Sequence, residues 1–490
     1  MNDIITGIMA TAGREPGRTA IVDGRGHELA YRELARRVDA VRAAMDGLRP
    51  GDGVLFAVRP GVEAVVAALG AVAAGGMLVL ADPGLAPGVL AARMAATRPG
   101  WVVAESLLYT LSGPLKGLAR RRGLLLPHLR DPLPGHPVRH LRTGPWLPGV
   151  PRGALRLDRL PGAPAGHASA PPQEDRPAAV IFTSGTTASP RGVVHTRGSL
   201  AAGLELFRGA FPLEPGDVVH TDQLMLGLPA LMAGAAWSLP GRGPVVEELA
   251  ARRATHTFAV PVQLDRLLRR TPRLPGTLRH LLLGSAPAPA GVLRRAVEAG
   301  PEVLSVYAMT EALPIAIASA EEKLAHASGD LLGAPLPGVG VRVAGDGELF
   351  VSGPHVAPRY LGEDPLREVA TGDLVRIEDG RLVLLGRKKD MILRDGFNIY
   401  PGLYEPAITA LPGVAEAAIV GLADPATGDE EVVLAIVPTG DYDETLLRKV
   451  LPDLVDAAAL PDRIVALDAF PRSGRADKLD RAALRSRVAR

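Results

Sequence analysis

Short apolar runs alternate with amphipathic stretches through the first hundred or so residues of the chain. The runs GVLFAV and GMLVLA end at a charged residue, and the stretches between them space their apolar residues as a helix does. This alternation is typical of an α/β fold with a parallel sheet. Residues 64–81 carry no charge over a length that borders on a membrane span, but they are rich in Ala and interrupted by Gly75-Gly76. We therefore expect a buried helix over 62–74, a strand over 77–80 and no transmembrane segment.

The alternation is interrupted once. Residues 126–177 combine closely spaced Pro, Gly, Arg and His with hardly any periodicity, which indicates a long irregular connection. After it, the apolar runs AAVIFTS, HTFAV, HLLLGS and VLSVYAMTE each end in small or polar residues. From Gly333 onwards short strands and turns follow, and Asp379-Gly380 between two apolar runs predicts a β-hairpin. The last hundred or so residues mix strands with helices, and we interpret them as a separate, smaller α+β domain.

Composition narrows the classes of function. The 490 residues are 47% hydrophobic and include no cysteine, which excludes extensive disorder, disulfides, thiolate catalysis and zinc fingers. A net charge of +2 gives no case for a surface that binds nucleic acid. The N-terminus lacks the basic segment and apolar stretch of a signal peptide, so we expect a cytoplasmic protein. Six of the 55 basic residues are lysines, so a Lys at a functional position is more informative in this chain than an Arg.

The sharpest local signal follows the apolar run 178–181. The segment FTSGTTASPRG combines hydroxyl side chains, glycines and one basic residue directly after a predicted strand. Hydroxyls and backbone N–H groups donate hydrogen bonds to a polyphosphate, glycine lets the backbone approach it, and a cation balances its charge. The spacing of a Walker A loop has no match. A flexible connection rich in Ser, Thr and Gly is the alternative interpretation.

A second segment, SVYAMTE, combines an aromatic, a hydroxyl and a carboxylate at the end of a β-like run. The Tyr307 ring has a face that can stack on a base, the Thr310 hydroxyl can bond a phosphate, and the Glu311 carboxylate can hold Mg²⁺. The structural alternative is a strand end followed by the N-terminus of a helix at Thr310-Glu311.

Two more segments lie towards the C-terminus. The carboxylate of Asp373, in TGD, can accept hydrogen bonds from both hydroxyls of a ribose, and Arg387 follows across the expected hairpin. A turn aspartate and a surface arginine are the ordinary alternative. The segment PRSGRADKLDR would by itself be a solvated tail, yet it contains Lys478, one of the six lysines.

Taken together and in this order, these segments resemble the adenylate-forming superfamily of acyl-CoA synthetases, adenylation domains of nonribosomal peptide synthetases, and luciferases. The resemblance extends from about Arg14 to Leu484. TSGTTASPRG is similar to the family's TSGTTGxPKG, YAMTE to YGxTE, TGDLVRIEDGRLVLLGRKKDMI to the block from TGD to GRxKDxI, and DGFNIYPGLYE to GFxIxPxEVE. GELFVSGPHVAPRYLG is similar to the family's segment before TGD.

The resemblance implies an α/β fold in two domains. A large N-terminal ATP- and acyl-binding domain over 1–386 would contain parallel and mixed sheets flanked by helices, plus a β-barrel-like subdomain. A small, mobile α+β lid domain over 387–490 would complete it. Lys389 matches the family's hinge, about which the small domain rotates.

The resemblance also assigns roles to matching positions. It implies that the β- and γ-phosphates of ATP lie against Thr183, Ser184, Gly185, Thr186, Thr187 and Arg191, and that Ser285, Ala286, Pro287 and Tyr307 enclose the adenine. Thr310 would contact the α-phosphate, Glu311 would bind Mg²⁺, and Asp373 and Arg387 would bind the ribose. Lys478 would stabilise charge as the acyl-phosphate bond forms, so Lys478, Thr310 and Glu311 are the catalytic candidates.

Several positions depart from the family pattern. Ala188 and Ala308 stand where the family has glycine, and Arg191 where it has lysine. Lys478 lies one residue further along than the common spacing, so Arg475 is an alternative carrier of its role.

The implied reaction joins a carboxylate to ATP, giving acyl-AMP and pyrophosphate, and then transfers the acyl group to the thiol of CoA or of phosphopantetheine on an acyl carrier protein. Residues 224–240 carry no charge and are expected to line the acyl pocket, with core packing as the alternative. This favours a hydrophobic, fatty carboxylate over an amino acid. A β-lactone synthetase acting on a β-hydroxy fatty acid, and a catalytically silent homologue that binds acyl groups or nucleotides, are the alternative hypotheses.

Overall fold

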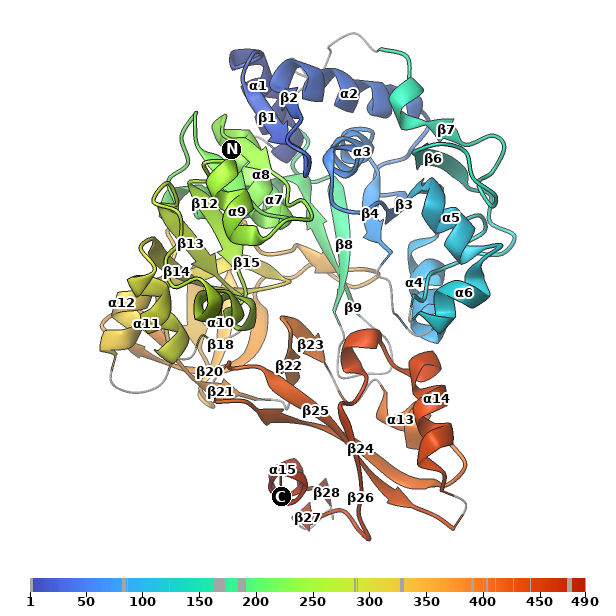
Figure 1. Cartoon of the computed structure of the whole chain (residues 1–490), viewed down its shortest axis with the longest axis vertical. Helices are drawn as coiled ribbons and strands as arrows, with labels where there is room; N and C mark the ends of the chain where they lie inside the picture. The colour runs from blue at the N-terminus through green and yellow to red at the C-terminus, as the bar shows by residue number, and fades with distance from the viewer. Residues whose placement is uncertain are drawn as a thin grey trace.

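A computed structural model describes most of the chain, and Figure 1 shows how its elements are arranged. The described residues are 3–81, 85, 87–122, 124–162, 172–183, 191–285, 288, 290–326, 330–388, 392–399, 401, 404–409, 411–425, 427–440, 442–473 and 478–489. For Arg387 and Lys478, which lie in strands, the description covers the backbone.

One large sheet has eight strands in the order β19-β9-β8-β4-β3-β5-β6-β7. Their bounds are β3 (Gly53–Ala57), β4 (Met77–Leu80), β5 (Trp101–Glu105), β6 (Arg139–Thr143), β7 (Leu155–Arg156), β8 (Pro177–Thr183), β9 (Arg191–Thr196) and β19 (Arg359–Tyr360). The strands from β8 to β7 are parallel neighbours, whereas β9 and β19 are antiparallel to theirs. The sheet is therefore mixed, as expected.

The second large sheet has thirteen strands in the order β17-β18-β20-β21-β16-β15-β14-β13-β12-β10-β11-β1-β2. Their bounds are β1 (Thr19–Val22), β2 (Glu28–Ala30), β10 (Val218–His220), β11 (Ala236–Ser238), β12 (His256–Ala259), β13 (His280–Leu283), β14 (Glu302–Met309), β15 (Ala312–Ser319), β16 (Asp330–Pro335), β17 (Gly340–Val343), β18 (Glu348–Ser352), β20 (Val369–Glu378) and β21 (Arg381–Arg387). The central strands from β1 to β14 are parallel, and every pair from β14 to β17 is antiparallel.

Helices cover both sheets and fill the space between them. In the N-terminal part they are α1 (Ile4–Arg14), α2 (Tyr31–Ala44), α3 (Val62–Ala73), α4 (Pro87–Thr97), α5 (Ser106–Ser112), α6 (Lys116–Arg121), α7 (Arg197–Ala210), α8 (Leu224–Ala233), α9 (Val245–Ala251), α10 (Pro261–Arg270), α11 (Ala290–Glu298) and α12 (Ala320–Ala325). One apolar core joins α1, α2, α3, α7 and α8 to strands of both sheets, so the two sheets are held together through helices. None of the helices within the described residues is long and apolar enough to cross a membrane.

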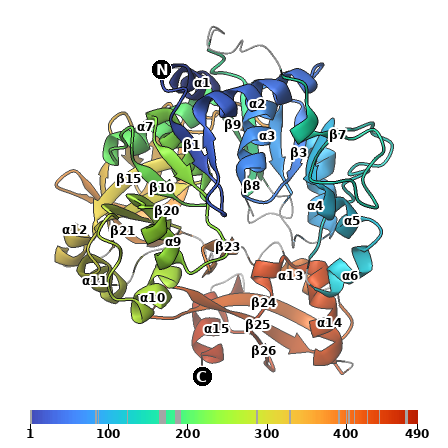
Figure 2. The ribbon, with the colours of Figure 1, turned by 45° about the horizontal axis from the view of Figure 1, so that its top comes forward.

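The C-terminal part is a small α+β unit, which forms the lower layer of Figure 2. Its strands are β22 (Ile392–Arg394), β23 (Phe397–Ile399), β24 (Val414–Ala423), β25 (Glu430–Pro438), β26 (Arg463–Ala466), β27 (Arg472–Ser473) and β28 (Lys478–Leu479), and its helices are α13 (Glu405–Thr409), α14 (Glu444–Leu454) and α15 (Arg481–Val488). Helices α13 and α14 pack on one face of the β24–β26 sheet and α15 on the other. The fold thus has the expected large N-terminal sheet domain and small C-terminal domain.

Local predictions in the first domain agree with the structure. Helix α3 and strand β4 occupy the positions expected for a helix over 62–74 and a strand over 77–80. Gly75 takes a φ of 101°, a left-handed conformation that ends the helix and returns the chain to the sheet. Asp379 and Gly380 have φ values of 49° and 76°, as a two-residue turn between β20 and β21 requires.

The connection over 126–177 is more regular than expected. It contains β6 and β7, which extend the eight-stranded sheet in parallel beyond β5. A strand that joins an existing sheet edge is stabilised by backbone hydrogen bonds to its neighbour, which local periodicity does not reveal. Outside β6 and β7, the 3-10 turn Leu157–Arg159 and the first residue of β8, the described residues of this segment lack helix and strand.

Candidate active site

A pocket of about 290 Å³ lies where the ends of β13 and β14 face β20, β21 and the turn between β22 and β23. Its walls come from several parts of the chain that lie far apart in the sequence. The lining residues are Ile181, Ser285, Ser305, Val306, Tyr307, Ala308, Met309, Thr310, Leu313, Lys323, Asp330, Leu332, Asp373, Leu384, Leu393 and Gly396.

Tyr307 and Asp373 meet directly in this pocket. The Tyr307 hydroxyl, from β14, donates a 2.7 Å hydrogen bond to Oδ2 of Asp373, from β20. Three strands separate β14 from β20 in the hydrogen-bonding order, so the antiparallel half of the sheet must curl to bring them together. That curl corresponds to the barrel-like subdomain expected from the sequence. Arg387 lies opposite Asp373 in the backbone register of β20 and β21.

Ser285 forms part of the wall that faces Tyr307. It follows β13 with a φ of 73°, a left-handed conformation that is uncommon for a residue with a side chain. Gly396, from the β22–β23 turn, lies against it, because a Cβ on Gly396 would be 3.5 Å from Cβ of Ser285. Ala286 and Pro287, the other two residues expected beside the adenine, lie outside the described residues.

Thr310 and Glu311 form the tip of the antiparallel hairpin of β14 and β15, which corrects the structural alternative of a helix N-terminus. Nε2 of His195 donates a 2.7 Å hydrogen bond to the Thr310 carbonyl, since a carbonyl can only accept. Burial lowers the pKa of His195, so its ring is neutral at pH 7. A second hydrogen bond, 2.8 Å from the Ala357 N–H to the Glu311 carbonyl, fixes the same tip.

The Glu311 carboxylate is buried beside an aromatic and a cation. Burial raises its pKa, whereas the Tyr360 hydroxyl, which donates a 3.1 Å hydrogen bond to Oε1, and the nearby Arg191 guanidinium lower it. Arg191 lies 5.0 Å above the Tyr360 ring centroid, a cation–π arrangement. The Arg191 side chain is 55% exposed, and its Nε is 3.6 Å from the Glu363 carboxylate. A carboxylate, a phenol and a guanidinium are therefore grouped beside the hairpin tip whose Thr310 lines the pocket.

The expected phosphate loop begins and ends at this cluster. Thr183 ends β8 and pairs with Arg191 at the start of β9. Ser184, Gly185, Thr186 and Thr187 lie between them, outside the described residues, as does the hinge candidate Lys389. The strand predicted before this motif is thus present as β8, and β9 follows the motif.

Lys478 is the expected catalytic residue that the structure does not bring to the pocket. Its backbone lies in β28, which pairs with β27 near the C-terminus, and β28 lies far from β14 and β15 in Figure 1. The C-terminal residues that reach the pocket are Leu393 and Gly396, from β22 and the β22–β23 turn.

Two features of the site were missed by sequence reasoning. Tyr360 lies within GELFVSGPHVAPRYLG, but no role was assigned to it. Lys323 lines the pocket with a side chain 4% exposed, and its Nζ is paired with the Asp330 carboxylate and donates a 2.6 Å hydrogen bond to the Leu331 carbonyl. The rarity of lysine, which singled out Lys478, would have marked Lys323 as well.

Helix α8 does not line the pocket, although residues 224–240 were expected to do so. Leu226, Ala230 and Leu231 are buried in the apolar cores that join α8 to its neighbours. Gly227 packs so closely on the Trp237 ring that a Cβ there would be 2.0 Å from a ring atom. Much of the uncharged stretch therefore packs in the core, which was the alternative interpretation, whereas Leu224 is exposed and the acyl-pocket role of the stretch stays a prediction.

Comparisons with known proteins found two matching family models and several similar enzymes. A family model described as AMP-binding enzyme matches residues 8–361, and one described as AMP-binding enzyme C-terminal domain matches 404–476. The 2-succinylbenzoate–CoA ligase of Bacillus mycoides (strain KBAB4) is 32% identical over 63% of this chain and 70% of its own length. A feruloyl-CoA synthase of an Amycolatopsis species is 28% identical over 94% of both chains. The amide bond synthetase McbA from Marinactinospora thermotolerans superposes with a TM-score of 0.81 at 25% identity, covering 99% of both chains.

Proposed function

The chain belongs to the AMP-binding enzyme family, and from this premise we propose that it activates a hydrophobic carboxylic acid with ATP and transfers the acyl group to the thiol of CoA. Two of the relatives it is similar to are named as a CoA ligase and an acyl-CoA synthase, which supports a thiol acceptor. In the first step the carboxylate oxygen attacks the α-phosphorus of ATP and pyrophosphate leaves. In the second the thiolate sulfur attacks the acyl carbon and AMP leaves.

The observation that carries this proposal is the pairing of Tyr307 with Asp373 in one pocket. The Tyr307 ring offers an apolar face for the adenine. The hydroxyl of the same tyrosine holds the Asp373 carboxylate, which can accept from both ribose hydroxyls. The backbone of Arg387 lies opposite Asp373 in the register of β20 and β21, a position consistent with the ribose-binding role proposed for this residue.

The cluster of Glu311, Tyr360 and Arg191 would suit the phosphates and a magnesium ion. Mg²⁺ bound with ATP needs one or two protein carboxylates, since phosphate oxygens and water complete its shell. Glu311 supplies a buried carboxylate beside the Thr310 hydroxyl, and Arg191 supplies a cation next to the predicted phosphate loop. When bound, the ion would neutralise negative charge on the phosphates. The chain's own part is to hold Glu311 in place through Tyr360 and to orient the phosphates through Arg191.

The two steps call for different placements of the C-terminal domain. In the described arrangement Gly396 closes the pocket and β28, which carries Lys478, lies elsewhere. We assign this arrangement to thiol transfer, because the lysine that would stabilise the first transition state is absent from the pocket. Adenylation would then require rotation about Lys389, which brings Lys478 to the α-phosphate.

The proposed substrate is defined by its chemical class, a hydrophobic carboxylic acid. The pocket wall next to Thr310 includes Ile181, Val306, Met309 and Leu313, which are apolar, and the paired Lys323 and Asp330 are engaged with each other. An apolar wall suits an aliphatic or an aryl acid. The relatives named for feruloyl and succinylbenzoyl groups favour including aryl acids beside the fatty acids expected from the sequence.

Pyrophosphate exchange tests the proposal. Wild-type protein is given ATP, Mg²⁺ and labelled pyrophosphate with a panel of acids: aliphatic acids of graded length, ferulate, 2-succinylbenzoate and free amino acids. We expect exchange with a hydrophobic acid, little with amino acids, and a CoA thioester once CoA is added. Asp373→Ala should abolish exchange, while Asp468→Ala, at an exposed aspartate, should not. No exchange with any acid would favour the silent homologue, and AMP release from a β-hydroxy acid without CoA would favour the β-lactone synthetase.

A further inference from the structure

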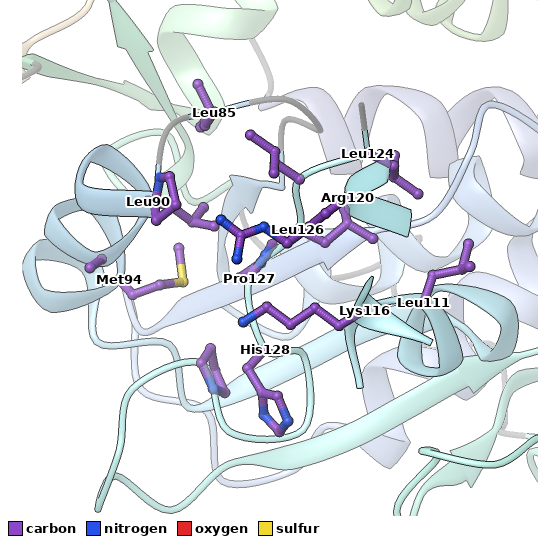
Figure 3. Close-up of a pocket in the computed structure, with 14 residues that line it drawn as sticks. Leu85, Leu90, Met94, Leu111, Lys116, Arg120, Leu124, Leu126, Pro127 and His128 are labelled. Atoms are coloured by element: carbon purple, nitrogen blue, oxygen red, sulfur yellow. The ribbon is translucent and has the colours of Figure 1, made fainter. Parts of the chain in front are cut away.

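A second cavity, of about 280 Å³, lies on the side of the molecule that carries α4, α5 and α6. Figure 3 shows it between α4, the α5–α6 pair and the segment that follows α6. It shares no lining residue with the pocket around Tyr307. The proposed reaction makes no use of it.

The walls of this cavity combine an apolar floor with a basic rim. Leu90 and Met94, from α4, are buried and form part of the floor with Leu125. Lys116 and Arg120, from α6, form part of the rim, and in Figure 3 both side chains extend from α6 in the direction of α4. His128 adds a further basic group, and no acidic side chain of the described residues lines the cavity.

The two α6 cations have little to balance their charge. They lie four residues apart, one turn along the helix, where like charges repel. Among the described residues, Lys116 makes no ion pair, and Arg120 pairs with Asp453 of α14. That pair is solvated, with side-chain exposures of 44% for Arg120 and 53% for Asp453, and ion pairs of this kind contribute little. The rim therefore carries two cations whose charge the described residues barely compensate, which favours an anion there.

We propose that this cavity binds an amphiphilic carboxylate: an aliphatic chain lies against Leu90, Met94 and Leu125, and its carboxylate lies between Lys116 and Arg120. An apolar pocket with a few polar groups at its mouth is the usual form of a small-molecule site. Lys116 would gain a charge-assisted partner that the described residues do not provide, and Arg120 would exchange its solvated pair with Asp453 for one. This site goes beyond the proposed function, and it stands or falls independently of catalysis at Tyr307.

The site would communicate with the C-terminal domain through Arg120. A bound carboxylate competes with Asp453 for the same guanidinium, so occupancy would weaken a contact between α6 and α14. By linkage, loss of the Asp453 charge should in turn strengthen carboxylate binding. A variant that removes the Asp453 charge should therefore bind the carboxylate more tightly than the wild type does.

Calorimetric titration of the full-length protein with decanoate provides the test. Lys116→Gln and Arg120→Gln should each weaken binding at this site by about fivefold or more, and Asp453→Asn should strengthen it. Arg121→Gln, which changes a cation of α6 outside the cavity, is the matched control and should leave binding unchanged. Decanamide, which keeps the chain and loses the charge, and acetate, which keeps the charge and loses the chain, should both bind far more weakly.

Location is tested separately, because decanoate is also a candidate substrate at the other pocket. A crystal soaked with 10-bromodecanoate should show an anomalous bromine peak beside Leu90 and Met94, and the Lys116→Gln crystal should lose that peak while keeping any peak near Tyr307. Bromine solely near Tyr307 would overturn the proposal. So would titrations in which the α6 variants bind decanoate as the wild type does, or in which decanamide binds equally well.

Discussion

The hydroxyl of Tyr307 fixes the carboxylate of Asp373, and this single hydrogen bond connects the proposed adenine and ribose subsites. Both partners are held by backbone structure: Tyr307 lies in β14, and the Asp373 N–H donates a 3.1 Å hydrogen bond to the Thr371 hydroxyl. A carboxylate whose orientation is set before the ligand arrives loses less entropy on binding. The bond should therefore matter more for ATP affinity than for the chemical step.

Tyr307→Phe removes the hydroxyl and keeps the aromatic face. A hydrogen bond to a charged group contributes about 1.5–3 kcal/mol, so the KM for ATP should rise on the order of tenfold or more with kcat nearly unchanged. Exchange kinetics at varied ATP measure both quantities. Tyr442→Phe, at a tyrosine of the C-terminal domain, serves as the control. An unchanged KM in Tyr307→Phe would mean that Asp373 does not depend on this bond.

Tyr360→Phe probes the buried carboxylate of Glu311. The Tyr360 hydroxyl donates to Glu311 and lowers its pKa against the effect of burial, so the substitution should raise that pKa further. Below its pKa the carboxyl group is protonated and neutral and cannot hold a cation. The acidic limb of the exchange-rate profile should therefore move to higher pH, and the rate relative to wild type should fall as the pH is lowered. A uniform loss across the pH range would contradict this role.

At the scale of elements, α7 positions the hairpin that carries Thr310 and Glu311. His195 lies at the end of β9, directly before α7, and holds the Thr310 carbonyl, while Gly203 of α7 faces the start of β15. A Cβ on Gly203 would be 2.2 Å from the Leu313 carbonyl oxygen. The absence of a side chain at Gly203 therefore sets how closely the hairpin packs on the helix.

Gly203→Ala should force α7 and β15 apart. Overpacking of this kind costs about 1–3 kcal/mol of unfolding free energy, and exchange activity should fall as the hairpin moves. Gly209→Ala, in the same helix with no heavy atom within 4 Å of the added Cβ, should raise the unfolding free energy by up to about 1 kcal/mol. Urea unfolding followed by circular dichroism compares the two. Equal changes in unfolding free energy for the two variants would show that the close packing of Gly203 on Leu313 does not restrict the side chain at this position.

Elements with strong local signals could be predicted, and those created by distant pairing could not. Helix α3, strand β4 and the Asp379-Gly380 turn depend on nearby residues, and the structure confirms them. Strand β6 depends on an open neighbour, β5, and the tip at Thr310-Glu311 depends on β15 folding back onto β14. An uncharged run such as 224–240 is compatible with both a core and a pocket wall. The apolar pattern of the sequence cannot distinguish the two, because the difference depends on which distant residues pack against the run.

The same distinction applies to the site. Tyr307 and Asp373 could be proposed from motif type, since each belongs to a segment with its own signature, and the structure brings them within hydrogen-bonding distance. Tyr360 owes its importance to Arg191 and Glu311, residues far away in sequence. Sequence motifs identify residues for every step of a reaction without saying which residues meet at the same time. The structure has one arrangement of the two domains, and in that arrangement the backbone of Lys478 lies away from the pocket.

At the scale of the whole molecule, Gly396 and Lys478 should separate the two half-reactions. Gly396 has a φ of 79°, and an added Cβ would be 3.3 Å from Cγ1 of Val260. Gly396→Val should therefore disturb the described arrangement, lowering thioester formation at least tenfold while pyrophosphate exchange stays within about threefold. Lys478→Ala should lower pyrophosphate exchange at least tenfold, while thioester formation from supplied acyl-AMP stays within about threefold. Equal losses in both assays for either variant would contradict the assignment of this arrangement to thiol transfer.

The order of the thirteen-stranded sheet has a practical consequence for dissecting the protein. Strands β20 and β21 come late in the chain but lie between β18 and β16. A fragment that stops at residue 361, where the family match ends, would lack both of them, although the unmatched segment up to Arg387 also carries Asp373. It would expose the backbone of β16 and detach the β17–β18 hairpin, and uncovered strand backbones recruit other chains. Such a fragment should accumulate in inclusion bodies, so soluble production of the N-terminal part alone has to extend through Arg387.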